Sequence, residues 1–203
     1  NDMTNKEYLK GYEKYAKEYA IHTSNKLIQF QLNHFISLLP KNAKILDAGC
    51  SSGRDSEYFA EEKLEVSAVD IIKPLIEEAK KNVKNVTFGV MDIKNLILKD
   101  SIFDGIWCMS TISDVEKKDA DNVIKNFSRV LKNNGILYIS AREGSGEKVI
   151  EKGFFNDLPR FYAYYSQEEM ENLLRKNNFK ILKSIVSDSQ SVRWVEIFAQ
   201  KVR

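Results

Sequence analysis

The stretch ILDAGCSSGRDS, residues 45–56, decides the fold of this chain. An apolar run ends in the acidic Asp47, a loop with Gly49 and Gly53 follows, and a helical pattern then begins. Glycines let a backbone approach a ligand closely, and the first turn of a helix offers backbone N–H groups that the helix itself does not use. The succession of strand, glycine loop and helix therefore predicts a site for a nucleotide-like ligand.

The spacing inside this loop separates three such ligands, which are NAD, FAD and S-adenosylmethionine. A dinucleotide site favours the pattern Gly-x-Gly-x-x-Gly, in which the pyrophosphate sits on the helix N-terminus. Here three residues separate Gly49 from Gly53, and Ser51 occupies the place of a middle glycine. The acidic Asp47 before the loop suits a positively charged ligand, and S-adenosylmethionine carries both an ammonium and a sulfonium group.

Two further apolar runs also end in acidic residues. Asp70 lies 23 residues after Asp47, where a carboxylate can accept hydrogen bonds from both hydroxyls of a ribose. Asp92, between Met91 and Ile93, can accept a hydrogen bond from an adenine amino group. Each aspartate alone could instead cap a turn or a helix. Together, three strand ends that finish in an acid predict a site for S-adenosylmethionine.

Short apolar runs alternate with amphipathic segments along most of the chain. The apolar runs cover residues 44–48, 65–70, 86–91, 103–109 and 135–141, and helix-like segments lie near 53–63, 73–82 and 117–132. This alternation predicts right-handed βαβ units and a parallel sheet with both faces covered. The runs 180–188 and 192–201 are separated by three residues and predict an antiparallel hairpin. The expected fold class is α/β: a Rossmann-like, doubly wound, mostly parallel sheet with a C-terminal antiparallel hairpin and N-terminal helices.

Two pairs of residues have the spacing of a helix capping box. Thr4 and Glu7 open a helical region over residues 4–39, in which tyrosines recur at helical intervals, and its second helix runs from about residue 24 to 39. Ser166 and Glu169 open a helix that ends near position 177. No linker divides the chain, so residues 1–203 are expected to form a single domain, with a helical cap over 1–40 and a substrate-side insertion over 142–165.

The composition is that of an ordinary globular protein. Of the 203 residues, 43% are hydrophobic and 30% are charged, and the net charge is +2. No apolar run approaches the roughly 18 residues that span a bilayer, and the N-terminal pattern is not that of a signal peptide. Two cysteines are too few for a disulfide framework. These features predict a cytoplasmic protein without a membrane partner.

The stretch from about Tyr12 to Lys201 resembles the class I S-adenosylmethionine-dependent methyltransferases, in particular their small stand-alone domains. In that family a DxGxGxG loop wraps the methionine part of the cofactor, and DAGCSSG departs from this pattern at Ser51. Serine fits there if its φ is negative. FSRVLKNNGILYIS, residues 127–140, is similar to the helix, turn and strand that follow in the family. The resemblance implies S-adenosylmethionine as cofactor and S-adenosylhomocysteine as product.

The resemblance also implies roles for residues outside the loop. Arg54 would reach the cofactor carboxylate, Tyr19 would lie over the cofactor, and Cys108 and Met109 would supply backbone contacts beside it. No metal is expected, because the two histidines lack ligand spacing. The expected cofactor-binding residues are Tyr19, Asp47, Gly49, Cys50, Ser51, Gly53, Arg54, Asp70, Ile71, Asp92, Ile93, Cys108 and Met109.

The end of the fourth apolar run, WCMSTISDV (107–115), bears on the acceptor. It lacks the (Asp/Asn)-Pro-Pro-aromatic tetrapeptide that usually marks methylation of amide or exocyclic adenine nitrogens. Asp114 stands where many relatives have a histidine, which some use as a base. Asp114 could therefore be a catalytic base or bind an amine. It could also cap the helix that begins near Glu116, which is the favoured interpretation.

Residues 141–179 resemble a subgroup in which a glycine-rich loop precedes an Arg-aromatic-aromatic stretch. This insertion is expected over the carboxyl ends of the strands, where substrates bind in open α/β sheets. Residues 143–165 are expected to form a lid hinged on Gly144 and Gly146, although the alternate spacing of the aromatics could instead mark a strand packed on the core. The polar and aromatic residues of this region are Arg142, Glu143, Arg160, Tyr162, Tyr164 and Tyr165. The expected substrate contacts are Arg142, Arg160, Tyr164 and Tyr165.

The acceptor itself has several interpretations. The guanidinium of Arg160 suits a carboxylate or a phosphate, whereas the tyrosines suit a cationic or planar acceptor, and both stay open. The expected function is transfer of a methyl group to a small-molecule acceptor by in-line displacement. The alternatives are an RNA methyltransferase, a non-catalytic cofactor-binding module and an NAD-dependent oxidoreductase. A basic block that would favour RNA is missing, and the oligomeric state leaves no signal in the sequence.

Overall fold

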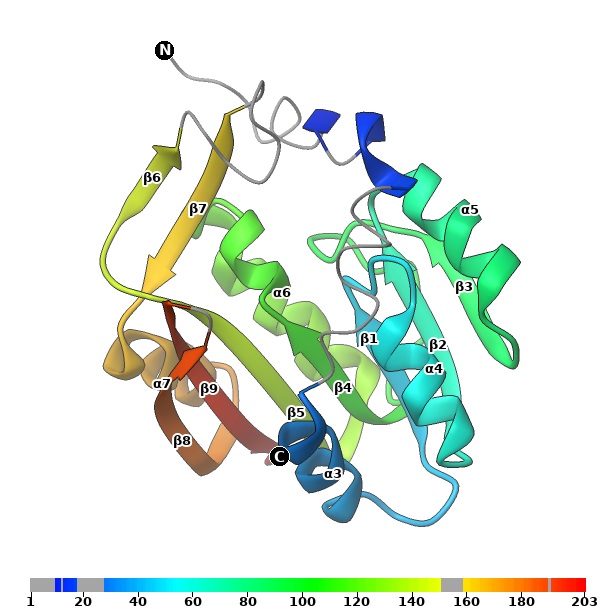
Figure 1. The fold of residues 1–203 in the computed structure, drawn as a ribbon. Coiled ribbons are helices and arrows are strands. Elements are labelled where there is room, and N and C mark those ends of the chain that lie inside the picture. Colours follow the sequence, from blue (N-terminus) through cyan, green and yellow to red (C-terminus); the bar gives the residue numbers. More distant parts are fainter. Residues whose placement is uncertain (1–9, 12, 18–27, 151–158, 190) are drawn as a thin grey trace.

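The computed structural model describes residues 10–11, 13–17, 28–150, 159–189 and 191–203. The nine strands of this part of the chain form one sheet in the order β3-β2-β1-β4-β5-β7-β6, with β9 paired to β5 and β8 paired to β9 (Figure 1). The parallel strands are β1 (Lys44–Ala48), β2 (Glu65–Asp70), β3 (Val86–Val90), β4 (Phe103–Met109) and β5 (Leu131–Glu143). These are the five predicted strands, and β5 extends beyond the predicted run at both ends.

The C-terminal hairpin is also confirmed. Strand β8 (Phe179–Ser189) pairs antiparallel with β9 (Val192–Lys201), and β9 pairs antiparallel with β5. Helix α7 (Gln167–Lys176) precedes the hairpin, and the backbone N–H of Glu169 donates to the Ser166 hydroxyl at 3.0 Å, as its capping-box spacing predicted. The α/β class and its antiparallel end therefore follow the sequence pattern.

The other helices whose bounds the structure gives are α3 (Gln29–Ser37), α4 (Arg54–Glu61), α5 (Lys73–Asn82) and α6 (Lys117–Val130), together with a short 3₁₀ turn η1 (Thr111–Asp114). The first predicted capping box and three of the four N-terminal tyrosines lie outside the described residues. Helix α3 ends before Pro40, as predicted. Within the described part of the chain, every helix is too short or too polar to cross a bilayer.

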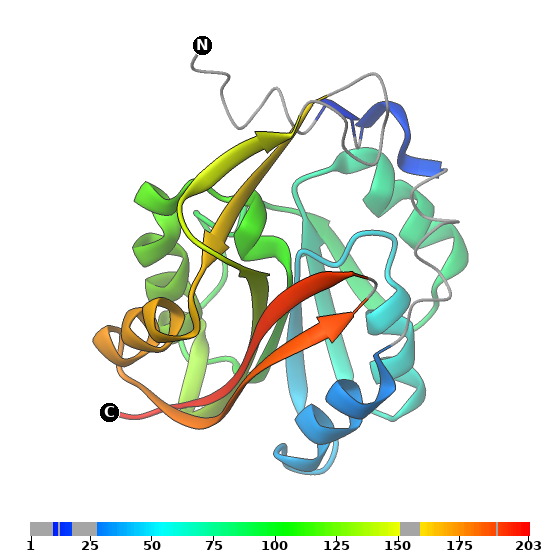
Figure 2. The same cartoon turned by 60° about the vertical axis from the view of Figure 1, so that its left-hand side comes forward.

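Buried apolar clusters cover both faces of the sheet. Val123, Ile124 and Phe127 of α6 recur at helical spacing and pack with Leu137 and Ile139 of β5. On the other face, residues of α3 and α4 pack around Trp107 and Tyr138. Figure 2 shows α6 and α7 on one side of the sheet and α3 and α4 on the other. Both faces are thus covered, which leaves the strand ends as the place for a ligand.

The segment expected to form a lid contains two paired strands. Strand β6 (Glu147–Ile150) is antiparallel to β7 (Arg160–Tyr165). Strand β7 in turn pairs parallel with the end of β5, where Arg142 lies opposite Tyr164. The β6–β7 pair projects from the end of β5 in both views (Figures 1 and 2). Residues 151–158 of the expected lid lie outside the described residues. The alternation of aromatic side chains therefore reflects a strand.

Candidate active site

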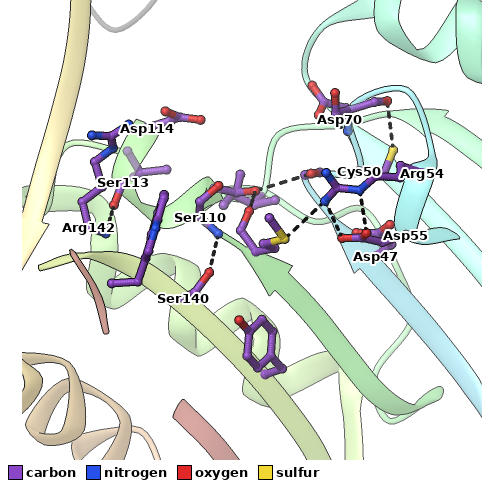
Figure 3. A pocket seen from close by; sticks show the side chains of 18 of the residues that line it. Asp47, Cys50, Arg54, Asp55, Asp70, Ser110, Ser113, Asp114, Ser140 and Arg142 are labelled. Atoms are coloured by element: carbon purple, nitrogen blue, oxygen red, sulfur yellow. Dashed lines mark hydrogen bonds and ion pairs between the residues drawn. The ribbon is translucent and has the colours of Figure 1, made fainter. Parts of the chain in front are cut away.

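A cavity of about 790 Å³ opens at the carboxyl ends of the parallel strands. Its size is within the usual range for small-molecule sites. Figure 3 shows Asp47, Arg54, Asp55 and Asp70 at one end and Ser113, Asp114 and Arg142 at the other, with Ser110 and Ser140 between them. The first group comes from β1, β2 and the start of α4. The second comes from η1 and the end of β5, so the two ends are built by different parts of the fold.

The glycine loop is a tight structure at the first end. The backbone N–H groups of Gly49 and Cys50 both donate to the Val69 carbonyl at 2.9 Å. Gly49 has a φ of +86°, and a Cβ there would lie 2.0 Å from the Thr111 hydroxyl oxygen. Only glycine fits this close approach between the loop and η1.

Ser51 differs from the sequence expectation. Its φ is +53°, in the left-handed region, whereas a negative φ was the condition for serine at this position. Its backbone N–H donates to Oδ2 of Asp70 at 2.9 Å, which holds the residue in this conformation. The Ser51 hydroxyl oxygen is buried and has no hydrogen-bond partner among the described residues. A buried polar atom without a partner on a cavity wall fits a site that a ligand completes.

Asp70 connects the ends of β2 and the glycine loop. Its other carboxylate oxygen accepts the backbone N–H of Ile72 at 2.9 Å. Burial raises the pKa of Asp70 to about 6, and these two N–H donors limit the rise. The carboxylate lines the cavity and keeps lone pairs for further donors. It is therefore able to accept hydrogen bonds from the hydroxyls of a ligand.

A buried network surrounds Asp47. The Ser56 hydroxyl donates to Asp47 at 2.6 Å, while Asp55 accepts from Nε of Arg54 and from the Trp107 indole, each at 2.9 Å. Burial and the neighbouring charge of Asp55 raise the pKa of Asp47 to about 8. Arg54 faces Asp55 and the Met109 sulfur rather than standing alone for a cofactor carboxylate. A cationic ligand group bound at this end would favour the ionised form of Asp47 and lower its pKa.

The raised pKa of Asp47 predicts how stability depends on pH. A carboxyl that is harder to ionise in the folded protein stabilises it fully below its unfolded pKa of about 4, and this stabilisation is lost as pH rises through about 8. Between pH 5 and 7 the free energy of unfolding of the ligand-free protein should fall more steeply than that of Asp47→Asn, by on the order of 1.4 kcal/mol per pH unit. Urea unfolding at both pH values measures the difference. Parallel pH dependences in the two proteins would contradict it.

Most of the expected cofactor-binding residues line the cavity. They are Asp47, Gly49, Cys50, Ser51, Arg54, Asp70, Ile71, Asp92, Ile93 and Met109. Asp92 also accepts the backbone N–H of Lys94 at 2.9 Å, so it caps a turn as well. Gly53 and Cys108 are not in the lining: Gly53 precedes α4 with a φ of +88°, and Cys108 is buried in the core. Tyr19 lies outside the described residues.

Asp114 does not cap a helix. Glu116 holds the N-cap position of α6, without a side-chain cap bond, so the favoured interpretation of Asp114 is wrong. Instead Arg160 donates to Asp114 at 2.5 Å across 46 positions of sequence. Burial raises the pKa of Asp114 although the Arg160 charge opposes the rise. Both residues line the cavity.

Strand β7 presents two different faces. Arg160 and Tyr162 line the cavity, whereas Tyr164 and Tyr165 do not. Alternation along the strand turns Tyr165 into the apolar core, where it is 2% exposed. The two tyrosines that the sequence favoured for the substrate are thus outside the cavity wall, and Tyr162 stands there instead.

The C-terminal hairpin supplies a wall that the sequence analysis missed. Trp194 and Glu196 of β9 line the cavity. Glu196 is 4% exposed and accepts hydrogen bonds from the hydroxyls of Tyr138 and Ser187, each at 2.7 Å. The sequence signal for this wall was the charged Glu196 inside the largely apolar run VRWVEIFAQK. Within the described parts of the chain, no three His, Cys, Asp or Glu side chains gather in a way that would hold a metal ion.

Comparison with known proteins gives a family and several relatives. The family described as "Methyltransferase domain" matches residues 45–135. Ubiquinone biosynthesis O-methyltransferase of Coxiella burnetii is 29% identical over 160 residues, which cover 77% of this chain and 62% of that protein. Malonyl-[acyl-carrier protein] O-methyltransferase of Pseudescherichia vulneris is 30% identical over 104 residues, covering 51% of this chain and 41% of that protein. The chain therefore spans less than two thirds of these curated relatives.

Solved structures give the same picture of the fold. The crystal structure of a SAM-dependent methyltransferase from Methanosarcina mazei matches with a TM-score of 0.75 at 21% identity, covering 83% of this chain and 97% of that chain. At this level of identity the likeness concerns the fold.

Proposed function

We propose that the chain contains a class I S-adenosylmethionine-dependent methyltransferase domain, as the family match over residues 45–135 and the fold support, and that it transfers a methyl group from S-adenosylmethionine to an oxygen atom of a small-molecule acceptor. The names of two relatives support oxygen, since both are O-methyltransferases. One observation carries the proposal. The same cavity joins an acidic end beside the glycine loop to an arginine-rich, aromatic end beside η1. Such a cavity has room for a cofactor and an acceptor together.

The acidic end fits S-adenosylmethionine. The carboxylates around Asp47 would attract its ammonium group, Asp70 would accept from its ribose hydroxyls, and Asp92 would accept from its adenine amino group. The buried Ser51 hydroxyl would gain a partner. When bound, S-adenosylmethionine supplies a methyl group that the sulfonium charge has already activated.

The other end would hold the acceptor and remove its proton. An in-line displacement needs an aligned nucleophile, exclusion of water and removal of one proton. We assign proton removal to Asp114, which lines the cavity and whose pKa burial raises. A carboxylate with a raised pKa is a stronger base than an exposed aspartate. Arg160 holds this carboxylate in place through their 2.5 Å contact.

The test begins with the cofactor. Calorimetry should give binding of S-adenosylmethionine and S-adenosylhomocysteine and none of NAD. Asp70→Ala should weaken that binding by roughly 10- to 150-fold, because the ribose hydroxyls lose charge-assisted hydrogen bonds. Asp100→Ala, which removes an exposed surface carboxylate, is the matched control. Unchanged affinity in a folded Asp70→Ala variant would contradict this assignment.

Transfer itself is measured with labelled S-adenosylmethionine. Wild-type protein should label a hydroxylated or carboxylated small molecule from a mixed panel, and the product should contain an O-methyl group. Labelling of RNA alone would overturn the small-molecule acceptor. Tight cofactor binding without labelling of any acceptor would favour a non-catalytic module.

A further inference from the structure

The acceptor end of the cavity contains two guanidinium groups with different surroundings. Arg160 is paired with Asp114 at 2.5 Å. Arg142 also lines the cavity, but none of the ion pairs among the described residues includes it. The positive charge of Arg160 is therefore balanced within the protein. That of Arg142 is available to a ligand.

Aromatic rings hold the Arg142 guanidinium. It lies 3.9 Å from the centre of the Tyr162 ring and 5.4 Å from that of Trp194. Its backbone is held as well, because the Arg142 N–H donates to the Ser113 hydroxyl at 2.9 Å. Rings that contact the flat face of a guanidinium leave the N–H groups at its edge for hydrogen bonds. Arg142 is thus preorganised for a planar anion that accepts two parallel bonds.

The same contacts decide against a cationic acceptor. The sequence left open whether aromatic side chains here would attract a positive ligand. Tyr162 and Trp194 already face the positive charge of Arg142, and Arg160 also approaches the Tyr162 ring, at 5.0 Å. A further cation beside these rings would be repelled. The rings therefore position a cation of the protein rather than one of the ligand.

The surrounding acids favour a single negative charge on the ligand. Asp114, Asp188 and Glu196 line the same part of the cavity as Arg142. Asp114 and Asp188 are paired with Arg160 and Arg193, so Glu196 is the carboxylate of this group without an ion pair among the described residues. A doubly charged phosphate would meet this carboxylate and would find only one guanidinium, that of Arg142, to balance its two charges. A carboxylate carries half that charge and matches the planar geometry of Arg142.

We propose that the acceptor carries a carboxylate that binds to Arg142 between Tyr162 and Trp194. This deepens the proposed function and rests on it, because Arg142 lies at the end of the cavity assigned to the acceptor. The acceptor class is then a small carboxylic acid.

The experiment compares two acceptors that differ only in charge. The probes are 3,4-dihydroxybenzoate and 3,4-dihydroxybenzamide, added to protein saturated with S-adenosylhomocysteine for calorimetry and with S-adenosylmethionine for turnover. Wild-type protein should bind the benzoate more tightly, and show a lower KM for it, by roughly 10- to 150-fold. Phenyl phosphate, compared with benzoate, tests the charge of the anion and should bind more weakly.

Variants of Arg142 identify the residue responsible. Arg142→Gln should abolish the preference for the benzoate over the benzamide, because the charge that distinguishes the two probes is gone, while S-adenosylhomocysteine still binds at the other end of the cavity. Arg142→Lys should keep part of the preference, because it retains the charge without the planar fork. Arg175→Gln, on the exposed side of α7, controls for the loss of a positive charge elsewhere. Thermal unfolding of each variant checks that it is folded.

The proposal would be overturned by equal binding of the two probes by wild-type protein, by binding of neither at millimolar concentration, or by a preference that survives in Arg142→Gln. Tighter binding of phenyl phosphate than of benzoate would also overturn it. Each of these leaves cofactor binding and methyl transfer to an uncharged acceptor intact. Failure of the proposed function would instead appear as loss of cofactor binding or of all turnover in wild-type protein.

Discussion

Asp114→Asn will lower kcat by roughly 100- to 10,000-fold, the usual contribution of a positioned base, while the affinity for S-adenosylmethionine stays unchanged. Asparagine has the same shape as aspartate and still accepts a hydrogen bond from Arg160, so the contact across the cavity is kept. It cannot take a proton from an acceptor hydroxyl. The loss should therefore fall on turnover rather than on binding.

The pH profile separates a base from a structural contact. In the variant, kcat should rise with pH, because an acceptor hydroxyl that ionises in solution no longer needs a base. Wild-type turnover should depend less on pH over the same interval. Asp100→Asn, at an exposed carboxylate paired with Arg129, serves as the matched control. If Asp114→Asn keeps its kcat within about threefold, proton removal belongs to another group, and Glu196 is the next carboxylate on that wall.

Gly49→Ala will destabilise the protein by about 2–5 kcal/mol and remove most of its cofactor affinity. A left-handed φ costs an alanine about 1–2 kcal/mol, and overpacking adds about 1–3 kcal/mol. The new Cβ would lie 2.0 Å from the hydroxyl oxygen and 2.6 Å from the Cβ of Thr111. Because the Thr111 Cβ is itself too close, no rotamer change relieves the clash. The backbone of the loop or of η1 has to move, and both line the cavity.

Gly89→Ala is the matched control for this experiment. Gly89 lies in β3, and an added Cβ there would have no atom within 4 Å. Its stability should equal or slightly exceed that of wild-type protein, because alanine reduces the freedom of the unfolded chain. Urea unfolding gives the free energies, and calorimetry gives the affinity for S-adenosylhomocysteine. A Gly49→Ala variant with wild-type values in both would refute the close contact between the loop and Thr111.

The two ends of the cavity differ in how far they could be predicted. Asp47, Asp70 and Asp92 were identified from the sequence, and all three line the cavity. The reason is topological: in a parallel sheet the carboxyl ends of neighbouring strands meet at one edge. Residues at those ends come together whatever the details of packing. The conformation of Ser51 was not predictable, because its positive φ depends on a hydrogen bond to Asp70, which is 19 positions away.

At the acceptor end the sequence suggested residue types but not their roles. It named Arg142, Arg160 and Asp114, yet it favoured a helix cap for Asp114 and left the charge of the acceptor open. The pairing of Asp114 with Arg160 joins η1 to β7 and has no local signal. Tyr162 and Tyr164 share one face of β7, and the position of β7 along β5 decides which of the two lies at the cavity.

The α/β fold, the glycine loop and the acidic residues at or just after the ends of the first three strands could be predicted from the sequence, because each follows from local periodicity or from the order of βαβ units. Tertiary structure alone decided which guanidinium stays available to a ligand. Arg142 pairs with Tyr164 of β7 and with Trp194 of β9, and this double register brings Tyr162 and Trp194 to its side chain. A shift of one residue in either pairing would turn these rings to the opposite face of the sheet. Such a register depends on which side chains the paired strands bury against the core, and these strands lie far apart in the sequence.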